Sequence, residues 1–370
     1  MLEITDAKQE ALKNESKGIF SSLSENNHEQ VLFCHDPETG LKAIIAIHNT
    51  VLGPALGGTR MWNYKSEEEA LRDVLRLSRG MSYKASISGL NLGGGKAVII
   101  GDSKKDKTEA MFRKFGRFIK NLNGKYITAE DVGTTTRDMT YVRMETTHVT
   151  GLPQSMGGGG DPSPVTAYGV FLGMKASVKE RFGSDSLSGK RILVQGVGNV
   201  GEALVKLLKN ENAKVFISDI NETQIMKVSD EFGAEVVNLN EIYDFDMDIY
   251  APCALGATLN SDTIPRLKCA IVAGSANNQL EDENIHGQMI MDRGILYAPD
   301  FLINAGGLIN AYSEYQGYNH ARAMQDTEKI YQYTIDIFKK SAREGVTTAS
   351  AAKKIAEQRI STIANVKSTF

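Results

Sequence analysis

The feature that most constrains the fold of this chain is a glycine-rich turn between a strand-like run and a helical stretch. Residues 191–195 form the strand-like run, residues 202–208 are helical in pattern, and a second run at residues 214–218 ends at Asp219. The turn itself has the spacing Gly-x-Gly-x-x-Gly and consists of Gly196, Val197, Gly198, Asn199, Val200 and Gly201. This spacing is weak alone, but a strand before it, a helix after it and an acid about 20 residues further on are typical of a dinucleotide-binding βαβ unit. The sequence therefore predicts a parallel Rossmann-like sheet.

The chemistry of this turn indicates which cofactor the unit binds. Its glycines let a pyrophosphate approach the backbone at a helix N-terminus, where free N–H groups and the helix dipole favour anions. Asp219 is placed to bind the adenosine ribose and to repel a 2′-phosphate. We therefore expect NAD rather than NADP, bound by residues 196–201 and Asp219.

Two further strand-like runs, at residues 247–250 and 270–273, each lead into a loop of small residues. Loops at the carboxyl ends of parallel strands line the ligand crevice of an open sheet. The second loop contains Asn277 and Asn278, whose amides suit a nicotinamide amide or a substrate amine. A plain turn explains an Asn pair equally well.

A second glycine-rich stretch, Gly-Leu-Asn-Leu-Gly-Gly-Gly-Lys at residues 89–96, precedes a strand-like run at residues 97–100. We expect its glycines to form a loop that presents Lys96 at the mouth of the strand. If Lys84 converges on the same pocket, each lysine lowers the pKa of the other, and one becomes a neutral amine able to act as a base near pH 7. Without further support, an ordinary loop with solvated lysines fits about as well.

Local patterns predict the other elements of the first half. Residues 30–35 and 41–48 indicate a β-hairpin. Ser66 and Glu69 indicate a capping box that starts a helix, which we expect to end near Gly80.

A further helix is expected over residues 108–120 and a strand over residues 126–128. Asp131 follows that strand, where a carboxylate suits a catalytic site and suits the cap of a turn equally well. The glycine-rich loop at residues 156–160 is well placed to join two domains, and residues 163–182 read as one helix.

Composition limits the remaining classes. A length of 370 residues with 41% hydrophobic residues predicts two domains with sizeable cores. The net charge of −3 leaves no basic excess for nucleic acid, and no apolar run is long enough to span a membrane. The charged N-terminus has no apolar signal region, and the three distant cysteines fit reduced thiols, so we expect a cytoplasmic protein. The six histidines have no metal-ligand spacing, so we expect no metal site.

Six motifs together resemble the Glu/Leu/Phe/Val dehydrogenase family, and most of all its leucine-specific branch. They are Gly-Gly-Thr-Arg-Met at 57–61, Arg-Gly-Met-Ser-Tyr-Lys at 79–84, Leu-Gly-Gly-Gly-Lys at 92–96, Thr-Ala-Glu-Asp-Val-Gly-Thr at 128–134, Pro-Ser-Pro-Val-Thr-Ala-Tyr-Gly at 162–169 and Asn-Ala-Gly-Gly at 304–307. The resemblance implies two domains: a substrate-binding and oligomerisation domain at 1–150 and an NAD-binding domain at 151–330. The C-terminal helices, about 331–370, would pack back near the first domain. It also implies a homo-oligomer, an octamer.

The resemblance implies reversible NAD-dependent oxidative deamination of leucine, valine and isoleucine to 2-oxo acids, ammonia and NADH. Lys96 would be the catalytic base that activates water, Asp131 would move protons at the amine, and Lys84 would hold the substrate carboxylate. The other residues implied at the substrate are Leu56, Gly58, Met81, Ala129, Asn278, Leu308 and Ala311. Those implied at the cofactor, besides residues 196–201 and Asp219, are Thr166, Cys253, Ala254 and Asn277.

The apolar character of Leu56, Ala129, Leu308 and Ala311 disfavours glutamate as substrate, because none of them could pair with a second carboxylate. Leucine-specific members more often carry valine at the last two positions, which leaves the ranking of leucine, valine and isoleucine open. A phenylalanine dehydrogenase and a non-catalytic NAD-binding regulator are the alternatives. A P-loop NTPase is excluded, since Leu90 stands where its first glycine should be and Ala97 where a magnesium-binding Ser or Thr should be.

Overall fold

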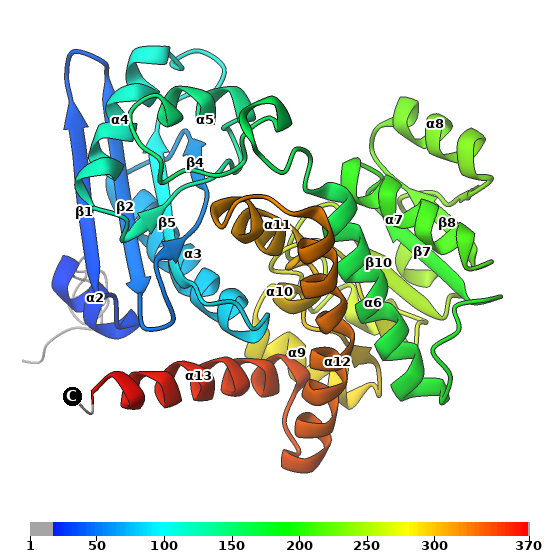
Figure 1. Cartoon of the computed structure of the whole chain (residues 1–370). Coiled ribbons are helices and arrows are strands. Elements are labelled where there is room, and N and C mark those ends of the chain that lie inside the picture. The colour runs from blue at the N-terminus through cyan, green and yellow to red at the C-terminus, as the bar shows by residue number, and fades with distance from the viewer. Residues whose placement is uncertain (1–17, 369–370) are drawn as a thin grey trace, which may run out of the picture.

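The computed structural model describes residues 18–368 and shows two α/β units, each built around its own sheet (Figure 1). The first sheet comprises, in spatial order, β1 (Gln30–Asp36), β2 (Leu41–Asn49), β5 (Gly93–Ile100), β3 (Ala55–Leu56) and β6 (Tyr126–Ile127), with β4 (Thr59–Trp62) paired to β5. The second comprises β12 (Leu296–Tyr297), β11 (Ile271–Val272), β10 (Ile249–Pro252), β7 (Arg191–Gln195), β8 (Lys214–Ser218) and β9 (Glu235–Val236). All strand pairs of the second sheet are parallel, so the predicted Rossmann-like sheet is confirmed.

Helices cover both faces of the first sheet. On β2 and β5, Ile44 and Val98 pack with the apolar side of α3 (Glu67–Ile87), whereas Ile45 and Ile99 face the other way and pack with α4 (Glu109–Asn121). Because alternate residues are buried on opposite faces, the stretches at residues 43–47 and 97–100 are continuously apolar. The unit also contains α2 (Ile19–Asn26) and α5 (Thr136–Arg143). The predicted hairpin of β1 and β2 is confirmed.

The expected glycine loop before Lys96 is wrong, because Gly93, Gly94 and Gly95 lie inside the buried strand β5. The glycines are needed for close packing rather than for bending. A Cβ on Gly94 would lie 2.1 Å from the backbone nitrogen of Ser82 on α3, and one on Gly93 would lie 1.9 Å from the carbonyl oxygen of Asn49. The missing side chain of Gly94 therefore lets α3 pack directly against β5, and that of Gly93 lets the backbone at Asn49 approach the strand.

The expected end of α3 near Gly80 is also wrong, since the helix continues to Ile87 and carries Lys84. Gly80 is exposed, and a Cβ added to it would meet no atom of another segment within 4 Å; packing of the residues on both sides of it sustains the helix. At its start, Ser66 accepts from the Glu69 N–H as predicted, but the Glu69 carboxylate accepts from the N–H of Lys65 instead of completing the capping box.

The second unit places its glycine turn at the point where the strand order reverses. From β7 the chain proceeds through α7 (Asn199–Asn210), β8, α8 (Glu222–Phe232) and β9 on one side, then returns to β10, β11, α9 (Glu283–Asp292) and β12 on the other. Ligands of open parallel sheets bind at such a reversal, between the carboxyl ends of the two central strands. The remaining segments of the unit are η1 (Gln154–Met156), α6 (Ser163–Phe182), η2 (Ile242–Asp244), η3 (Ile264–Arg266), α10 (Asp300–Ile303), α11 (Gly306–Tyr315) and α12 (His320–Glu344).

The C-terminal helix α13 (Thr348–Lys367) runs from the second unit along α3 of the first (Figure 1). The Ser86 hydroxyl donates to the carbonyl of Ala356 at 2.8 Å, and the Arg359 guanidinium donates to the carbonyl of Leu90 at 2.7 Å. Helix α13 therefore packs on the first unit. The division at residues 150 and 330 stays a prediction. Within residues 18–368, no helix has the length and apolarity to cross a membrane.

Candidate active site

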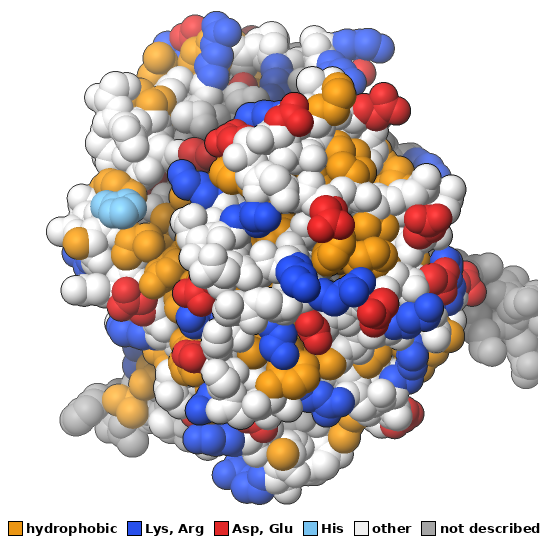
Figure 2. Space-filling model, turned by 90° about the vertical axis from the view of Figure 1, so that its right-hand side faces the viewer, with side chains coloured by type: hydrophobic (Ala, Val, Ile, Leu, Met, Phe, Trp, Pro, Cys, Tyr) orange, Lys and Arg blue, Asp and Glu red, His pale blue; other side chains and the backbone are white. Residues whose placement is uncertain are grey.

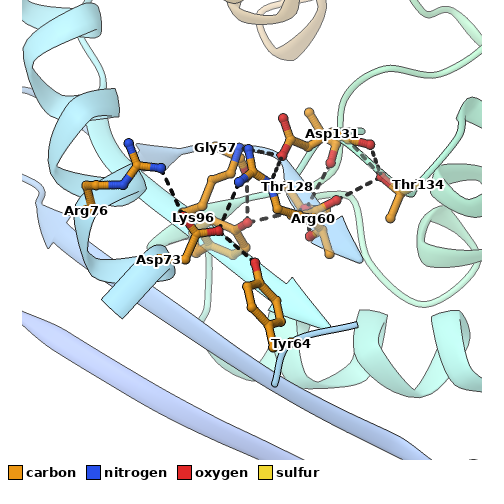
Figure 3. A network of polar contacts seen from close by, with 12 residues as sticks. Gly57, Arg60, Tyr64, Asp73, Arg76, Lys96, Thr128, Asp131 and Thr134 are labelled. Carbon is orange, nitrogen blue, oxygen red and sulfur yellow. Dashed lines mark hydrogen bonds and ion pairs between the residues drawn. The ribbon is translucent and has the colours of Figure 1, made fainter. Parts of the chain in front are cut away.

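Lys96, Asp131 and Arg60 meet in one part-buried ion cluster of the first unit (Figure 3). Lys96 comes from the middle of β5 and is only 6% exposed. Its Nζ lies 3.1 Å from Oδ2 of Asp131, and the same oxygen accepts from Nε of Arg60 at 3.0 Å. The backbone N–H of Asp131 donates to the Thr134 hydroxyl at 2.9 Å. The structure therefore brings the predicted base and proton carrier into contact.

The surroundings set the charges of this cluster. Burial lowers the pKa of Lys96, and the charge of Arg60 lowers it further, against the opposing effect of Asp131. Burial alone would raise the pKa of Asp131, but Lys96 and Arg60 hold it below its usual value. Asp131 is thus kept as a carboxylate, and Lys96 is an amine that gives up its proton more easily than a solvated lysine does.

Arg60 belongs to a wider network that sequence reasoning missed. Its NH1 donates to Asp73 at 2.9 Å, and Asp73 also accepts from the Tyr64 hydroxyl at 2.7 Å and from Arg76 at 3.0 Å (Figure 3). Arg60 stands in the family motif at 57–61, and this was the one feature of the sequence that pointed to it as a site residue. Its partner on α3 is distant enough in the sequence that no local pattern pairs them.

Lys84 faces the second unit. Its Nζ donates to Oδ1 of Asn304, at the end of α10, at 2.7 Å. Burial lowers the pKa of Lys84 to about 8, Lys96 lowers it as well, and the buried carboxyl of Asp300 opposes both. The predicted mutual effect of the two lysines is thus present at Lys84 but secondary to burial. Asn304 was missed as a site residue although it begins a quoted motif.

The other residues assigned to the substrate differ in their burial and contacts. Leu56 and Leu308 are buried in one hydrophobic cluster, against which Met81 and Ala311 pack. Gly58 has no room for a side chain, since a Cβ would lie 2.4 Å from the carbonyl oxygen of Glu130.

The half-buried Ala129 accepts at its carbonyl from the N–H of Thr59 at 2.8 Å. Asn278 is exposed and has a positive φ of 52°. That these residues surround a substrate stays a prediction.

The glycine turn after β7 is shaped as its sequence predicts. A Cβ on Gly201 would lie 2.0 Å from the carbonyl oxygen of Gly196, whereas Gly198 has nothing within 4 Å. The first pair lets helix and strand pack closely, and Gly198 leaves open space at the N-terminus of α7, which begins at Asn199 and continues with Val200. A pyrophosphate fits such a cradle.

Asp219 reaches the same turn from the end of β8. Its Oδ2 accepts from the N–H of Val197 at 2.7 Å, and its Oδ1 accepts from the N–H of Asn221 at 2.9 Å. These bonds hold the carboxylate beside the turn, where the acid of a dinucleotide fold accepts a hydrogen bond from a ribose hydroxyl.

The loops after β10 and β11 lie beside this turn. A Cβ on Gly196 would lie 2.7 Å from the backbone nitrogen of Ala254, and Sγ of Cys253 accepts from the N–H of Ser275 at 3.5 Å. Asn277 bonds Asn304 in the same region.

Thr166, in the first turn of α6, donates its hydroxyl to the carbonyl of Pro162 at 2.9 Å. The structure therefore gathers the predicted loops at the strand-order reversal, and the cofactor contacts themselves stay predictions.

The remaining observations concern surface charge and metal ligands. Basic and acidic side chains are interspersed over the face in Figure 2, in keeping with a net charge of −3. Among the described residues no group of three or more His, Cys, Asp or Glu side chains could hold a metal ion.

A parallel sheet with a dinucleotide-type turn, joined to a unit that carries two lysines of lowered pKa and an aspartate, defines a dehydrogenase that uses a nicotinamide cofactor. Two family models match the chain. "Glu/Leu/Phe/Val dehydrogenase, dimerisation domain" matches residues 28–148, and "Glutamate/Leucine/Phenylalanine/Valine dehydrogenase" matches residues 157–225 and 217–369. The chain belongs to this family of amino-acid dehydrogenases.

Individual relatives agree with this assignment. The chain is 57% identical over 352 residues to a leucine dehydrogenase of Bacillus cereus, covering 95% of this chain and 96% of that protein. It is 45% identical to a phenylalanine dehydrogenase of Thermoactinomyces intermedius, again covering 95% and 96%. The crystal structure of L-tryptophan dehydrogenase from Nostoc punctiforme superposes with a TM-score of 0.84 at 48% identity, covering 94% of this chain and 100% of that one.

Proposed function

We propose that this protein catalyses the reversible NAD-dependent oxidative deamination of branched-chain L-amino acids, with leucine, valine and isoleucine as substrates. The observation that carries the proposal is the buried contact of Lys96 with Asp131, in the unit whose Lys84 reaches the dinucleotide-type unit. Several relatives named leucine dehydrogenase, at 54–57% identity, support the choice of substrate over phenylalanine.

Each charged group has a role that follows from its state. The Lys84 ammonium binds the substrate carboxylate, whose arrival raises the pKa of the lysine again. Hydrolysis of the carbon–nitrogen bond of the oxidised substrate needs a base for water and an acid for nitrogen. Burial lowers the pKa of Lys96 and so lets its neutral amine take a proton from water, while Asp131 carries protons to and from the nitrogen.

The nicotinamide cofactor, when bound, accepts the hydride and returns it in the reverse direction. Residues 196–201 and Asp219 would hold it, and the open space at Gly198 suits its pyrophosphate. We propose NAD rather than NADP, because the Asp219 carboxylate beside the turn disfavours a 2′-phosphate.

We further propose a homo-octamer and a cytoplasmic location. The match of residues 28–148 to a dimerisation domain supports self-association, and the three free cysteines support a reducing compartment. Light scattering should report eight times the mass of one chain; a monomer mass would contradict the octamer.

The test of the function is NADH oxidation in the presence of ammonia, across the 2-oxo acids that correspond to leucine, valine, isoleucine, phenylalanine, tryptophan and glutamate. We expect fast turnover of the three branched-chain acids. Preference for phenylpyruvate or indolepyruvate would keep the chemistry and overturn the substrate. Absence of turnover with every acid, in protein that still binds NADH, would overturn the function in favour of a non-catalytic NAD-binding regulator.

A further inference from the structure

Asn304 is the one residue of the described site whose side chain bonds both the substrate-side lysine and the cofactor-side loop. Its Oδ1 accepts from Lys84 of the first unit at 2.7 Å. Its Nδ2 donates to the carbonyl of Ser275 at 3.0 Å and to Oδ1 of Asn277 at 2.8 Å, both in the loop after β11. Asn304 itself is only 4% exposed, and all three bonds are part-buried.

These partners allow only one orientation of the Asn304 amide. A lysine ammonium can only donate and a backbone carbonyl can only accept, so Oδ1 must face Lys84 and Nδ2 must face Ser275. If the amide were reversed, its Nδ2 would face the donor Nζ of Lys84, and its Oδ1 would face the acceptor oxygen of Ser275. The Asn304 amide therefore has one orientation, and it ties the position of Lys84 to that of Ser275 and Asn277.

The same short helix, α10, holds the loop at a second point. The Asp300 carboxylate accepts from the N–H of Gln279 at 3.1 Å, four residues after Ser275. With the loop anchored at 275 and 279, Asn277 between them has its Oδ1 committed to Asn304. With that oxygen occupied, the NH₂ of the exposed Asn277 is the part of its amide left for a ligand, and it is a donor suited to a carboxamide oxygen.

We propose that Asn304 is a positioning residue that couples the two ligand subsites, so that a 2-oxo acid at Lys84 and a nicotinamide cofactor at Asn277 each strengthen the binding of the other. This inference rests on the proposed function. A ligand at either end holds that end of the Lys84–Asn304–Asn277 chain in its bonded arrangement. This arrangement is also the one that the other ligand needs, so each ligand favours the binding of the other.

The coupling can be measured without turnover, because a 2-oxo acid and NADH do not undergo reductive amination when ammonia is absent. NADH affinity is measured by fluorescence titration with and without saturating 4-methyl-2-oxopentanoate. For the natural chain we expect the acid to tighten NADH binding at least about fivefold, the lower end of ordinary allosteric coupling. A ratio of one in active enzyme would overturn the inference.

Two substitutions at Asn304 test its two sets of hydrogen bonds. Asn304→Asp keeps an acceptor for Lys84 but opposes the acceptors at Ser275 and Asn277, and Asn304→Ala removes both sides. In both variants we expect the fivefold effect to fall to less than about twofold. Coupling that survives in a folded variant would contradict the proposal.

Two further variants distinguish coupling from loss of structure. Asn277→Ala changes an exposed side chain, so its folding is not at risk, and it should also reduce the coupling. The double variant with Asn304→Ala should lose no more coupling than Asn304→Ala alone, because both act through one hydrogen bond; additive losses would contradict this. Asn310→Ala removes another buried asparagine, bonded to Tyr318 at 3.1 Å, and should keep the coupling.

The outcomes separate this inference from the function on which it rests. A natural chain that binds NADH but neither turns over nor responds to any 2-oxo acid would overturn both. A natural chain that turns over branched-chain acids and shows coupling, with coupling unchanged in the Asn304 variants, would overturn the inference alone.

Discussion

Lys96→Ala is the sharpest test of the catalytic assignment, because the structure separates its effect on stability from its effect on rate. Breaking a buried ion pair usually costs about 3–5 kcal/mol, since it leaves one charge uncompensated. Here Asp131 keeps a second partner, Nε of Arg60 at 3.0 Å. We therefore expect a smaller loss of about 2 kcal/mol, chiefly from the space left by the lysine stem.

The effect on rate should be much larger. A positioned general base contributes about 10²–10⁴-fold, and Lys96 is the buried amine that the proposed mechanism uses on water. We expect kcat for reductive amination of 4-methyl-2-oxopentanoate to fall by about 10³-fold, equivalent to about 4 kcal/mol in the activation barrier. NADH affinity should stay within about twofold of the natural value, because the turn at residues 196–201 belongs to the other sheet.

Three measurements on Lys96→Ala are required together: kcat from NADH oxidation, NADH affinity from fluorescence, and the thermal midpoint. Lys107→Ala is the matched control, since Lys107 also forms a part-buried pair, with Asp138 at 2.5 Å, outside the site. It should lose stability and keep kcat. A Lys96→Ala enzyme that retains a tenth of the natural kcat, or one that is folded and no longer binds NADH, would refute the assignment.

Three further predictions test the cofactor turn, the substrate lysine and the packing of β5. Asp219→Ala should weaken NAD binding and raise the kcat/KM ratio for NADP over NAD; an unchanged ratio would remove Asp219 from that role. Burial lowers the pKa of Lys84 to about 8, so the affinity of the NADH-bound enzyme for 4-methyl-2-oxopentanoate should decline as pH rises above about 8. In Lys84→Arg this decline should begin only above about pH 10, because a guanidinium keeps its charge. A flat affinity profile of the natural enzyme from pH 7 to 10 would contradict the prediction. Gly94→Ala, on β5, places a Cβ 2.1 Å from the backbone nitrogen of Ser82 on α3 and should lower the free energy of unfolding by at least about 3 kcal/mol. Gly80→Ala, on α3 where a Cβ has open space, should raise it by about 0.5–1 kcal/mol. Equal thermal midpoints of the two variants would show the packing argument to be wrong.

The parts of the fold that were predictable are those marked by local chemistry. The helix over residues 163–182 and the strands at 191–195 and 214–218 have the predicted bounds. Each is delimited by residues whose preference is intrinsic, such as Pro164 in a first helical turn and Gly183 in the left-handed conformation at its end. The turn between β7 and α7 was predictable for the same reason.

The errors in the first unit arose where packing overrode a local preference. Gly80 suggests a helix end, yet α3 continues because its far half is held by α13 and β5. The glycines at 93–95 suggest a loop, yet they form a central strand, because α3 at Gly94, the backbone of Asn49 at Gly93 and the ring of Tyr126 at Gly95 leave no room for side chains. In both places the deciding atoms belong to segments distant in the sequence, so no window around the glycine contains the information.

The same distinction explains which site residues were found. Lys84, Lys96 and Asp131 stand in motifs whose residue types suggest chemistry by themselves. Arg60 and Asn304 stand in such motifs too, but their importance depends on what they bond: a carboxylate in another strand–loop segment, and a lysine in the other unit. An arginine or an asparagine has no function that can be inferred from its type alone, so only the assembled contacts reveal it.

The lowered pKa of Lys96 shows how a correct conclusion can rest on the wrong dominant cause. Two lysines near each other suggest mutual repulsion, which depends on their separation and weakens where water can enter. Burial is instead the larger effect, and the nearby cation that adds to it at Lys96 is Arg60, itself tied to Asp131 and Asp73. A base built in this way keeps its lowered pKa even when a substrate carboxylate neutralises Lys84. Repulsion from Lys84 would fade when a substrate carboxylate binds there, whereas the effects of burial and of Arg60 do not depend on Lys84, so the pKa of Lys96 stays lowered when the proposed reaction needs it as a base.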